Sequence, residues 1–370
     1  MNLRLNDRIK KILKIFVICL LTFVFLFGIG EVIRRYTDPR WVLSMALKYR
    51  PYAFARHIFE PHEQDARNRN HSEYSYHINR HGFRGDDFSI EKPEGQVRIL
   101  MYGSSHLFDS RSEPPSWPER IEEILHEKGY AQVEVINAGI PGHTSPESVT
   151  RLFSRGHFLD PDYVFLVNGW SDLKFFNTSE PFPLYSIKPY HPSEAPKRVY
   201  RNSVDRFLGE HSVLYTHLRS RFYSHLEDLE TAKSKEETAL ETLDERAIEQ
   251  YRLTVELFVK LSEMIDATPV LVTQARLVSD SNTKKEIEEI TRASNLTHET
   301  LLRGYRIIDE TLRRSARENE NTLLWDLSPR ITGQSKYFQD HVHVNNLGSK
   351  KLAQLTAEFM EGHLIRPAEE

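Results

Sequence analysis

The sequence predicts an α/β protein, a three-layer α/β/α sandwich with a five-stranded parallel sheet, preceded by one N-terminal transmembrane helix. Two observations carry this prediction. Between residues 96 and 362, short apolar runs bounded by turn residues alternate with segments whose apolar positions recur at helical spacing. Near the N-terminus, residues 15–30 contain no charged side chain. Strands that alternate with helices favour a parallel sheet covered on both faces by right-handed crossovers.

The uncharged run at residues 15–30 predicts a membrane anchor. Crossing a bilayer takes roughly 17–25 mostly apolar residues, and Ile12 and Leu13 extend the run past Lys14, whose head group can reach the interface. Basic residues dominate the stretch before the run, which keeps the N-terminus in the cytoplasm. A cleaved signal peptide is the alternative, but no Ala-x-Ala-like site follows. We expect a single-pass inner-membrane protein with tail and anchor at 1–30 and an extracytoplasmic domain.

Residues 31–95 are expected to form a membrane-proximal segment. The basic and aromatic stretch 41–54 is suited to rest at the lipid interface. Residues 75–83 are interpreted as an edge strand. The only cysteine, Cys19, lies in the anchor, so the outer domain must rely on its packed core rather than on a disulfide.

The main domain is expected over residues 96–365. Apolar runs predict five strands, at 97–103, 133–139, 162–169, 269–274 and 321–328. Amphipathic segments predict helices at 117–129, 145–156, 247–265, 283–318 and 347–360. Ser145 is placed to cap the second of these helices, and Thr242 and Glu245 are spaced like a capping box before the third.

An insertion at about 172–241 interrupts the alternation and is too long for a plain connection. Its first half is rich in Pro and Tyr, whereas its second half has helical periodicity with Phe207, Leu214, Leu218 and Phe222 among charged residues. We interpret the insertion as a lid or as a surface for a protein partner. A surface excursion without a function is the alternative.

Four polar segments are placed at the carboxyl ends of predicted strands, the edge where parallel sheets bind ligands. They are residues 103–105, 137–145, 168–172 and 340–343. A serine nucleophile needs a base within hydrogen-bond reach, a carboxylate that orients the base, and donors for the developing oxyanion. The four segments hold candidates for each role, although no Gly-x-Ser-x-Gly elbow is present.

The order of these segments resembles the SGNH, or GDSL-type, hydrolase superfamily. Its blocks are Gly-Asp-Ser, a Gly after the second strand, Gly-x-Asn-Asp after the third, and Asp-x-x-His near the C-terminus. The stretch Asn79, Gly82, Phe83 and Arg84 is similar to the membrane-proximal part of bacterial anchored members. The resemblance covers residues 97–362 and implies the flavodoxin-like fold of that superfamily.

Carried onto this sequence, the resemblance implies a Ser-His-Asp triad. Ser105 matches the nucleophile, with Ser104 where the family has Asp; His343 matches the base and Asp340 its orienting carboxylate. Gly142 matches the oxyanion-hole glycine, whose amide would act beside that of Ser105.

The third block departs from the family pattern. Ser171 stands where the family has the asparagine that completes the oxyanion hole. Losing one such donor typically costs about 2.7–4 kcal/mol of barrier. The role therefore falls to Ser171, to Asn168 as the fallback, or is abandoned together with catalysis.

Composition and motifs limit the classes of partner and cofactor that we expect. A formal net charge of −4 gives no basic excess for nucleic acid. Asp340, His341 and His343 form a metal-like trio, but no further ligand has suitable spacing, so we expect no metal and no cofactor.

We therefore expect a membrane-anchored serine esterase or acyl transferase acting on O-acyl esters, with envelope polysaccharide or lipid as the substrate class. The alternative is a catalytically weak SGNH-fold protein that binds or assembles envelope components. The Ser171 departure motivates this alternative.

Overall fold

A computed structural model describes residues 2–37, 62–64, 76–109, 111–176, 202–219, 221–222, 242–294 and 296–365. The chain forms two compact units. The first comprises Met1–His57 and Tyr190–Glu237, and the second comprises Ile58–Pro189 and Thr238–Glu370. The sequence-based boundaries at residues 30, 95 and 365 remain predictions.

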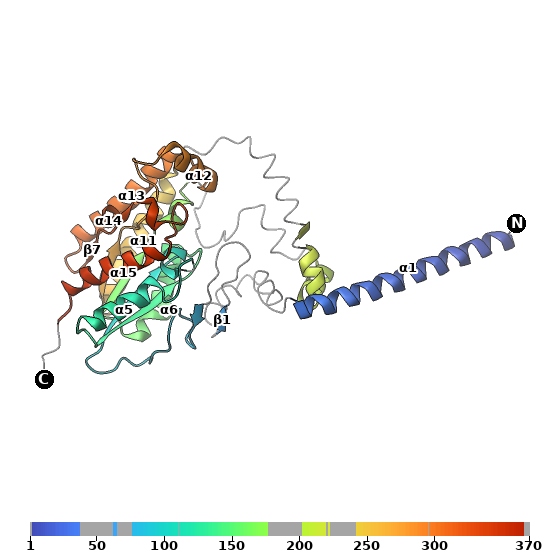
Figure 1. Cartoon of the computed structure of the whole chain (residues 1–370), viewed down its shortest axis with the longest axis horizontal. Coiled ribbons are helices and arrows are strands. Elements are labelled where there is room, and N and C mark those ends of the chain that lie inside the picture. Colours follow the sequence, from blue (N-terminus) through green and yellow to red (C-terminus); the bar gives the residue numbers. More distant parts are fainter. Residues whose placement is uncertain are drawn as a thin grey trace. The chain divides into compact units, whose positions relative to one another are not determined.

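The second unit is built on a five-stranded parallel sheet with the strand order β4-β3-β5-β6-β7. Its strands are β3 (Val97–Gly103), β4 (Val133–Gly139), β5 (Tyr163–Val167), β6 (Thr268–Val272) and β7 (Leu323–Trp325). In chain order this is the flavodoxin-like arrangement of doubly wound sheets. The predicted fold class is confirmed, and each strand overlaps the apolar run that predicted it (Figure 1).

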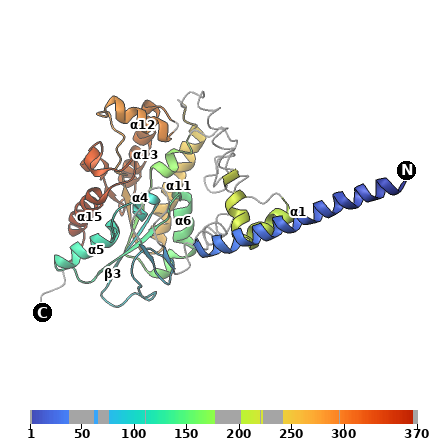
Figure 2. The same ribbon diagram turned by 45° about the vertical axis from the view of Figure 1, so that its right-hand side comes forward.

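Helices cover both faces of the sheet. One layer consists of α5 (Trp117–Glu127) and α15 (Asn346–Glu361), and the other of α6 (Ser145–Ser154), α11 (Glu245–Met264) and α13 (His298–Glu318) (Figure 2). Successive residues of β3 serve opposite layers, because Ile99 and Met101 join the core under α5 while Leu100 and Tyr102 join the core under α11. Burial on both faces explains why the strand sequences are mainly apolar.

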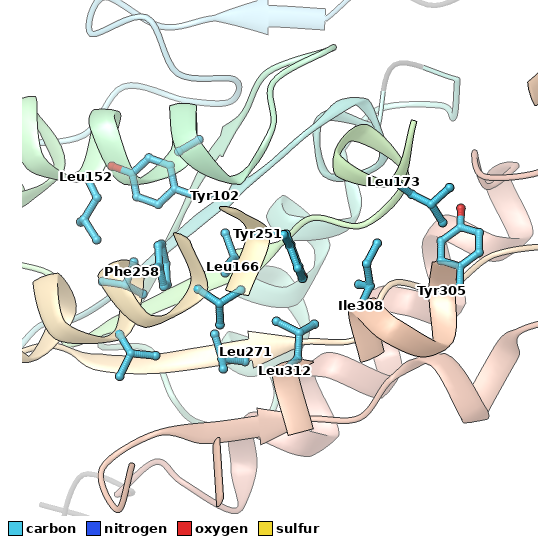
Figure 3. Close-up of a cluster of buried hydrophobic side chains, with 14 of the residues drawn as sticks. Tyr102, Leu152, Leu166, Leu173, Tyr251, Phe258, Leu271, Tyr305, Ile308 and Leu312 are labelled. Atoms are coloured by element: carbon cyan, nitrogen blue, oxygen red, sulfur yellow. The ribbon is translucent and has the colours of Figure 1, made fainter. Parts of the chain in front are cut away.

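The core under α11 fixes the sheet against its longest helices. Figure 3 shows Tyr251 and Phe258 of α11 over Leu166 of β5 and Leu271 of β6, and all four side chains are fully buried. Burying a large apolar side chain stabilises a fold by about 1.5–3 kcal/mol. This packing holds the strand ends that carry the candidate site in one rigid frame.

Two predicted helix starts were wrong by a few residues. Helix α11 is capped by Asp244, whose carboxylate accepts a hydrogen bond from the Arg246 amide, so Thr242 and Glu245 form no capping box. Helix α6 is capped one residue early by Thr144, and Ser145 is its first residue. Several adjacent polar residues compete for the cap in both segments, and tertiary contacts decide between them.

The helical stretch predicted at about 283–318 is confirmed and consists of two helices, α12 (Lys284–Ser294) and α13. Thr297 caps α13 by accepting a hydrogen bond from the amide of Thr300. A second N-cap inside a continuous amphipathic stretch is what divides it.

The edge strand predicted within 75–83 is present as a three-residue strand outside the five-stranded sheet. Strand β2 (Tyr76–Ile78) pairs antiparallel with β1 (His62–Gln64) in a separate two-stranded sheet. The side-chain oxygen of Asn79 accepts hydrogen bonds from the amides of His81 and Phe83, which turns the chain and ends the strand. The stretch 41–54, predicted to rest at the lipid interface, lies outside the described residues.

The first unit contains an N-terminal helix and the helical part of the insertion. Helix α1 (Asn2–Thr37) is long and apolar enough over Ile9–Thr37 to cross a membrane. Helix α9 (Ser203–His211) and a helix at 213–219 confirm the predicted helical character of this part of the insertion. The Pro- and Tyr-rich part at 177–201 lies outside the described residues.

Candidate active site

Three neighbouring strands of the sheet end level with one another. Gly103 of β3 pairs with Gly139 of β4 on one side and with Val167 of β5 on the other. The segments that follow these strands therefore leave the sheet side by side, at the edge where doubly wound folds bind ligands.

Ser105 lies two residues beyond β3, at the start of the short helix α4 (Ser105–Phe108). Ser104 precedes it as the N-cap in an extended conformation. The first amides of a helix have no partner inside the helix, so we expect the Ser105 N–H to face the edge of the sheet. Gly103 is required before this turn, because a Cβ there would lie 2.6 Å from the carbonyl oxygen of Val167.

The structure brings Ser105, His343 and Asp340 together across 238 residues of chain. The Nε2 atom of His343 lies 2.8 Å from Oγ of Ser105, and its Nδ1 atom lies 2.8 Å from Oδ2 of Asp340. With Nδ1 protonated toward the carboxylate, Nε2 is free to accept the serine proton. This is the hydrogen-bond chain that an activated serine needs.

The loop that carries Asp340 also fixes its ionisation. Oδ1 of Asp340 accepts hydrogen bonds from the amides of Val342, at 2.9 Å, and His343, at 2.7 Å. Burial opposes ionisation, but the interactions with His343 and these amides outweigh it and hold the pKa of Asp340 far below its usual value. The carboxylate therefore stays charged wherever a histidine titrates.

Arg111 also contacts the triad, although no sequence motif pointed to it. One of its guanidinium nitrogens donates to Oδ2 of Asp340, the same oxygen that faces His343. The segment around Arg111 has no motif, so only the fold shows the contact. Arg111 places a positive charge beside the carboxylate that would stabilise a protonated His343.

His106, next to the serine, was also missed. Its ring Nδ1 lies 3.1 Å from the carbonyl oxygen of Val342 and therefore carries a proton. Burial, reinforced by the proximity of His343, lowers the pKa of His106 to about 4. The neutral ring thus connects the serine helix to the loop that holds Asp340 and His343.

The Asn79 to Arg84 stretch, which resembled part of a family motif, braces the serine helix. The guanidinium of Arg84 donates to the carbonyl of Phe108 at the end of α4 and lies over the Phe108 ring, 5.2 Å from its centroid. Arg84 is buried, and its backbone forms an isolated antiparallel β-bridge with Asn137 of β4. The motif thus has a structural role behind the site.

Gly142 lies in the loop after β4 with a φ of +86°, a conformation that glycine adopts without strain. A Cβ placed on it would meet no atom within 4 Å. This open space is where the resemblance places the oxyanion-hole amide.

Asn168 and Ser171 follow β5 and are both buried. The amide oxygen and nitrogen of Asn168 have no hydrogen-bond partner among the described residues, although the residue is only 1% exposed. A buried, unpartnered amide costs about 1–3 kcal/mol, and natural proteins keep few of them. Val167 pairs with Gly103, so Asn168 and Ser104 each follow directly after paired ends of β5 and β3.

Further unpartnered polar atoms lie near Trp170, two residues after Asn168. Gln274, which follows β6, accepts a hydrogen bond from the Trp170 amide through Oε1, while its Nε2 has no partner in the described chain. Trp170 packs edge-on against His341 at 4.7 Å between centroids. Neither ring nitrogen of His341 has a described partner, and burial lowers its pKa. Donors and acceptors thus accumulate at this edge.

Asp172 connects the loops after β4 and β5. Its carboxylate accepts hydrogen bonds from the amide of Ser145, at 2.9 Å, and from its hydroxyl, at 3.0 Å. Complete burial raises the pKa of Asp172 to about 7 even though both hydrogen bonds favour the charged form. Ser145 is therefore a structural link rather than the cap predicted from the sequence.

We expect Asp172→Asn to stabilise the protein at high pH only. Because the pKa of Asp172 is raised in the fold, its contribution to stability is present below the unfolded pKa and is lost as the pH rises to about 7, by at most about 1.4 kcal/mol per pH unit. Buried His106 and His143 have lowered pKa values and give the opposite slope, so the variant-minus-parent difference is the quantity to measure.

Thermal unfolding of the detergent-solubilised chain from pH 4 to 8 provides this measurement. Each kcal/mol corresponds to about 2–4 °C in Tm. We expect a difference that grows between pH 4 and 7 and then levels off. An offset that is the same at every pH would contradict ionisation of Asp172 in this window.

Among the described residues, no group of three or more His, Cys, Asp or Glu side chains is arranged to hold a metal ion. The ring of His343 is used toward Ser105 and Asp340 instead.

No protein-family model matches the chain, and no curated protein matches its sequence. Among solved structures, it is similar to a lipase/acylhydrolase from Enterococcus faecalis, with 15% identity, a TM-score of 0.44 and coverage of 74% of this chain and 100% of that one. An acetylxylan esterase from Geobacillus stearothermophilus shows 14% identity, a TM-score of 0.42, and coverage of 73% and 95%. A putative G-D-S-L family lipolytic protein from Desulfitobacterium hafniense shows 12% identity, a TM-score of 0.38, and coverage of 71% and 99%. Residue roles therefore rest on the geometry of this chain.

Proposed function

We propose that this chain is a serine esterase or acyl transferase that cleaves O-acyl esters through Ser105, His343 and Asp340. The observation that carries the proposal is the continuous hydrogen-bond chain from Asp340 through His343 to Ser105, with 2.8 Å at both steps. A partly buried, hydrogen-bonded carboxylate that remains ionised is what a catalytic histidine needs as its support.

In the first half of the reaction, Oγ of Ser105 attacks the ester carbonyl carbon and its proton passes to Nε2 of His343. The amides of Ser105 and Gly142 and the side-chain amide of Asn168 are proposed to stabilise the oxyanion. When the tetrahedral intermediate collapses, the bond to the alcohol oxygen breaks and His343 delivers the proton to that oxygen. The acyl group remains on Ser105.

In the second half, water or an acceptor hydroxyl gives its proton to His343 and attacks the acyl-serine. Collapse releases Ser105, which recovers the proton from His343. Hydrolysis and transfer differ only in this acceptor, so both belong to the proposal.

We propose an O-acylated glycan as the first substrate class to test, with acylated lipid second. The unpartnered polar atoms of Asn168, Gln274 and His341 favour a ligand with hydroxyl groups over one that offers only acyl chains. Helix α1 supports anchoring in the cytoplasmic membrane, with its N-terminus inside and the catalytic unit outside.

The test is covalent labelling of the full-length protein in detergent with a fluorophosphonate, followed by peptide mapping. We expect one adduct, on the peptide that contains Ser105, and protection by acetylated oligosaccharide. Acetate release measured beside acetyl transfer to an added sugar then separates hydrolase from transferase. An unlabelled Ser105 would overturn the proposal and favour the weakly catalytic binding or assembly role.

We expect Arg111→Gln to lower kcat/KM by about tenfold, because the Arg111 guanidinium donates to Oδ2 of Asp340, the oxygen that also faces His343 and orients its ring. Steady-state kinetics with an acetyl ester test this. Arg111→Lys is the matched control, since it retains a charged donor and should stay within about threefold of the parent; a parental kcat/KM in Arg111→Gln would exclude the supporting role.

A further inference from the structure

The helical part of the insertion is attached to the end of α1. We call residues 202–222 the helix pair, comprising α9 and the helix at 213–219 with the residues around them. The carboxylate of Glu31 accepts hydrogen bonds from the hydroxyl of Ser212 at 2.8 Å and from the amides of Val213 at 2.9 Å and Leu214 at 2.8 Å. Glu31 therefore caps the second helix of the pair from a distance of more than 180 residues in sequence.

Neighbouring residues of α1 strengthen this attachment. Arg35 donates to the carbonyl oxygen of His211 at 2.7 Å, and a guanidinium nitrogen of Arg34 lies 3.1 Å from Nε2 of His217. Gly30 allows close approach, because a Cβ there would lie 2.8 Å from Cδ2 of Leu214. Figures 1 and 2 both show the pair against this end of α1.

The position of Glu31 sets the depth of the pair. Glu31 is the first charged residue after the uncharged run of α1. At about 1.5 Å per residue, that run and the apolar residues before it cover roughly the 30 Å hydrocarbon thickness of a bilayer. If α1 spans a membrane, the pair is held at the boundary between hydrocarbon and head groups.

The helix pair also buries an ion pair and exposes several apolar side chains. Asp205 and Arg219 are buried and form a two-pronged ion pair at 2.7 and 2.9 Å, to which the hydroxyl of Tyr215 donates at 2.8 Å. Val213 is buried, but four other apolar side chains of the pair are exposed by more than half, at Val204, Phe207, Leu218 and Phe222. A helix pair in water shows the reverse pattern, and phenylalanine and leucine partition into the membrane interface.

We infer that the helix pair is a second membrane contact, seated with Val204, Phe207, Leu218 and Phe222 in the acyl-chain and head-group boundary of the leaflet into which α1 emerges. The inference rests on the proposed anchoring of α1 and not on the proposed reaction. The partner is the lipid surface itself.

This contact bears on the candidate site through chain connectivity. Phe176 lies just after α7 (Trp170–Leu173), and its carbonyl accepts a hydrogen bond from the amide of Asp244; between them the chain leaves the second unit after Pro189 and re-enters it at Thr238. The chain that follows Asn168 to Asp172 is thus attached to the membrane through the helix pair, in addition to the segment that follows α1.

The test places an environment-sensitive nitrobenzoxadiazole probe on single cysteines of the full-length chain in phosphatidylcholine/phosphatidylglycerol vesicles. Nitroxide lipids quench it either near the head group or near the chain end. The native Cys19, exposed on α1, reports the anchor. Phe207→Cys and Leu218→Cys, each in a Cys19→Ser background, report the pair, and Phe153→Cys of α6, 66% exposed, is the control on the catalytic unit.

We expect roughly twofold quenching of the Phe207→Cys and Leu218→Cys probes by the shallow nitroxide, quenching of Cys19 by the deep one, and neither for Phe153→Cys. If the probe at Cys19 is quenched but the probe at Phe207→Cys or at Leu218→Cys is not, the inference is overturned and the anchor still stands. No quenching at Cys19 would overturn the anchor and the inference together. If the emission of the probe at Phe207→Cys is blue-shifted but not quenched, the inference is wrong and a protein surface, not lipid, covers this residue.

Discussion

Ser105→Ala is expected to lower kcat/KM for acetyl-ester hydrolysis on the order of 10⁴- to 10⁶-fold, because it removes the atom that forms the acyl-enzyme. Within the described chain, the 2.8 Å contact with His343 is the only hydrogen bond of the Ser105 hydroxyl, so its loss leaves the fold intact. Thermal unfolding of the variant should match that of the parent.

Ser104→Ala is the matched control for this experiment. Ser104 is buried, adjacent to Ser105, and makes no side-chain cap bond to α4. We expect less than about a tenfold change in kcat/KM, since the residue offers support rather than a reacting atom. Equal losses in the two variants, or an Ser105→Ala protein that retains parental turnover, would exclude Ser105 as the nucleophile.

The fold was predictable because its local and global signals agree. Most strand residues of the sheet are buried, so the strand sequences are mainly apolar, and turn residues mark their ends. The helix caps that were wrong depended on competition between equivalent local choices, as at Asp244 against Thr242. The orientation of side chains at helix ends is decided by tertiary contacts that periodicity does not contain.

The candidate site was predictable only where topology brings chain-distant motifs to one edge. Ser105 and His343 belong to segments that a doubly wound sheet must place at the carboxyl ends of its strands, and they meet there. Arg111, His106 and Gln274 have no comparable signal, because each lies in the site through a contact with one particular partner. Geometry at this level is visible only in the folded chain.

Asn168→Ala is expected to lower kcat/KM by about 10²- to 10³-fold, equivalent to 2.7–4 kcal/mol of lost oxyanion stabilisation. Ser171→Ala, in the position where the family has its asparagine, should change kcat/KM by less than about threefold, because the hydroxyl is shorter than an amide and reaches less far. The comparison is made by steady-state kinetics with one acetyl ester at a fixed pH.

Stability separates this role of Asn168 from a structural one. Neither polar atom of its side chain has a hydrogen-bond partner in the described part of the chain, so alanine breaks no bond and removes a buried, unsatisfied amide. We therefore expect the Tm of Asn168→Ala to equal or exceed that of the parent while activity falls. A joint loss of Tm and activity would make Asn168 a packing residue. A larger loss of activity in Ser171→Ala than in Asn168→Ala would return the donor to Ser171. A buried amide that lowers stability is best explained by a ligand that uses it. We propose that this ligand is the oxyanion that develops beside Ser105 during the reaction.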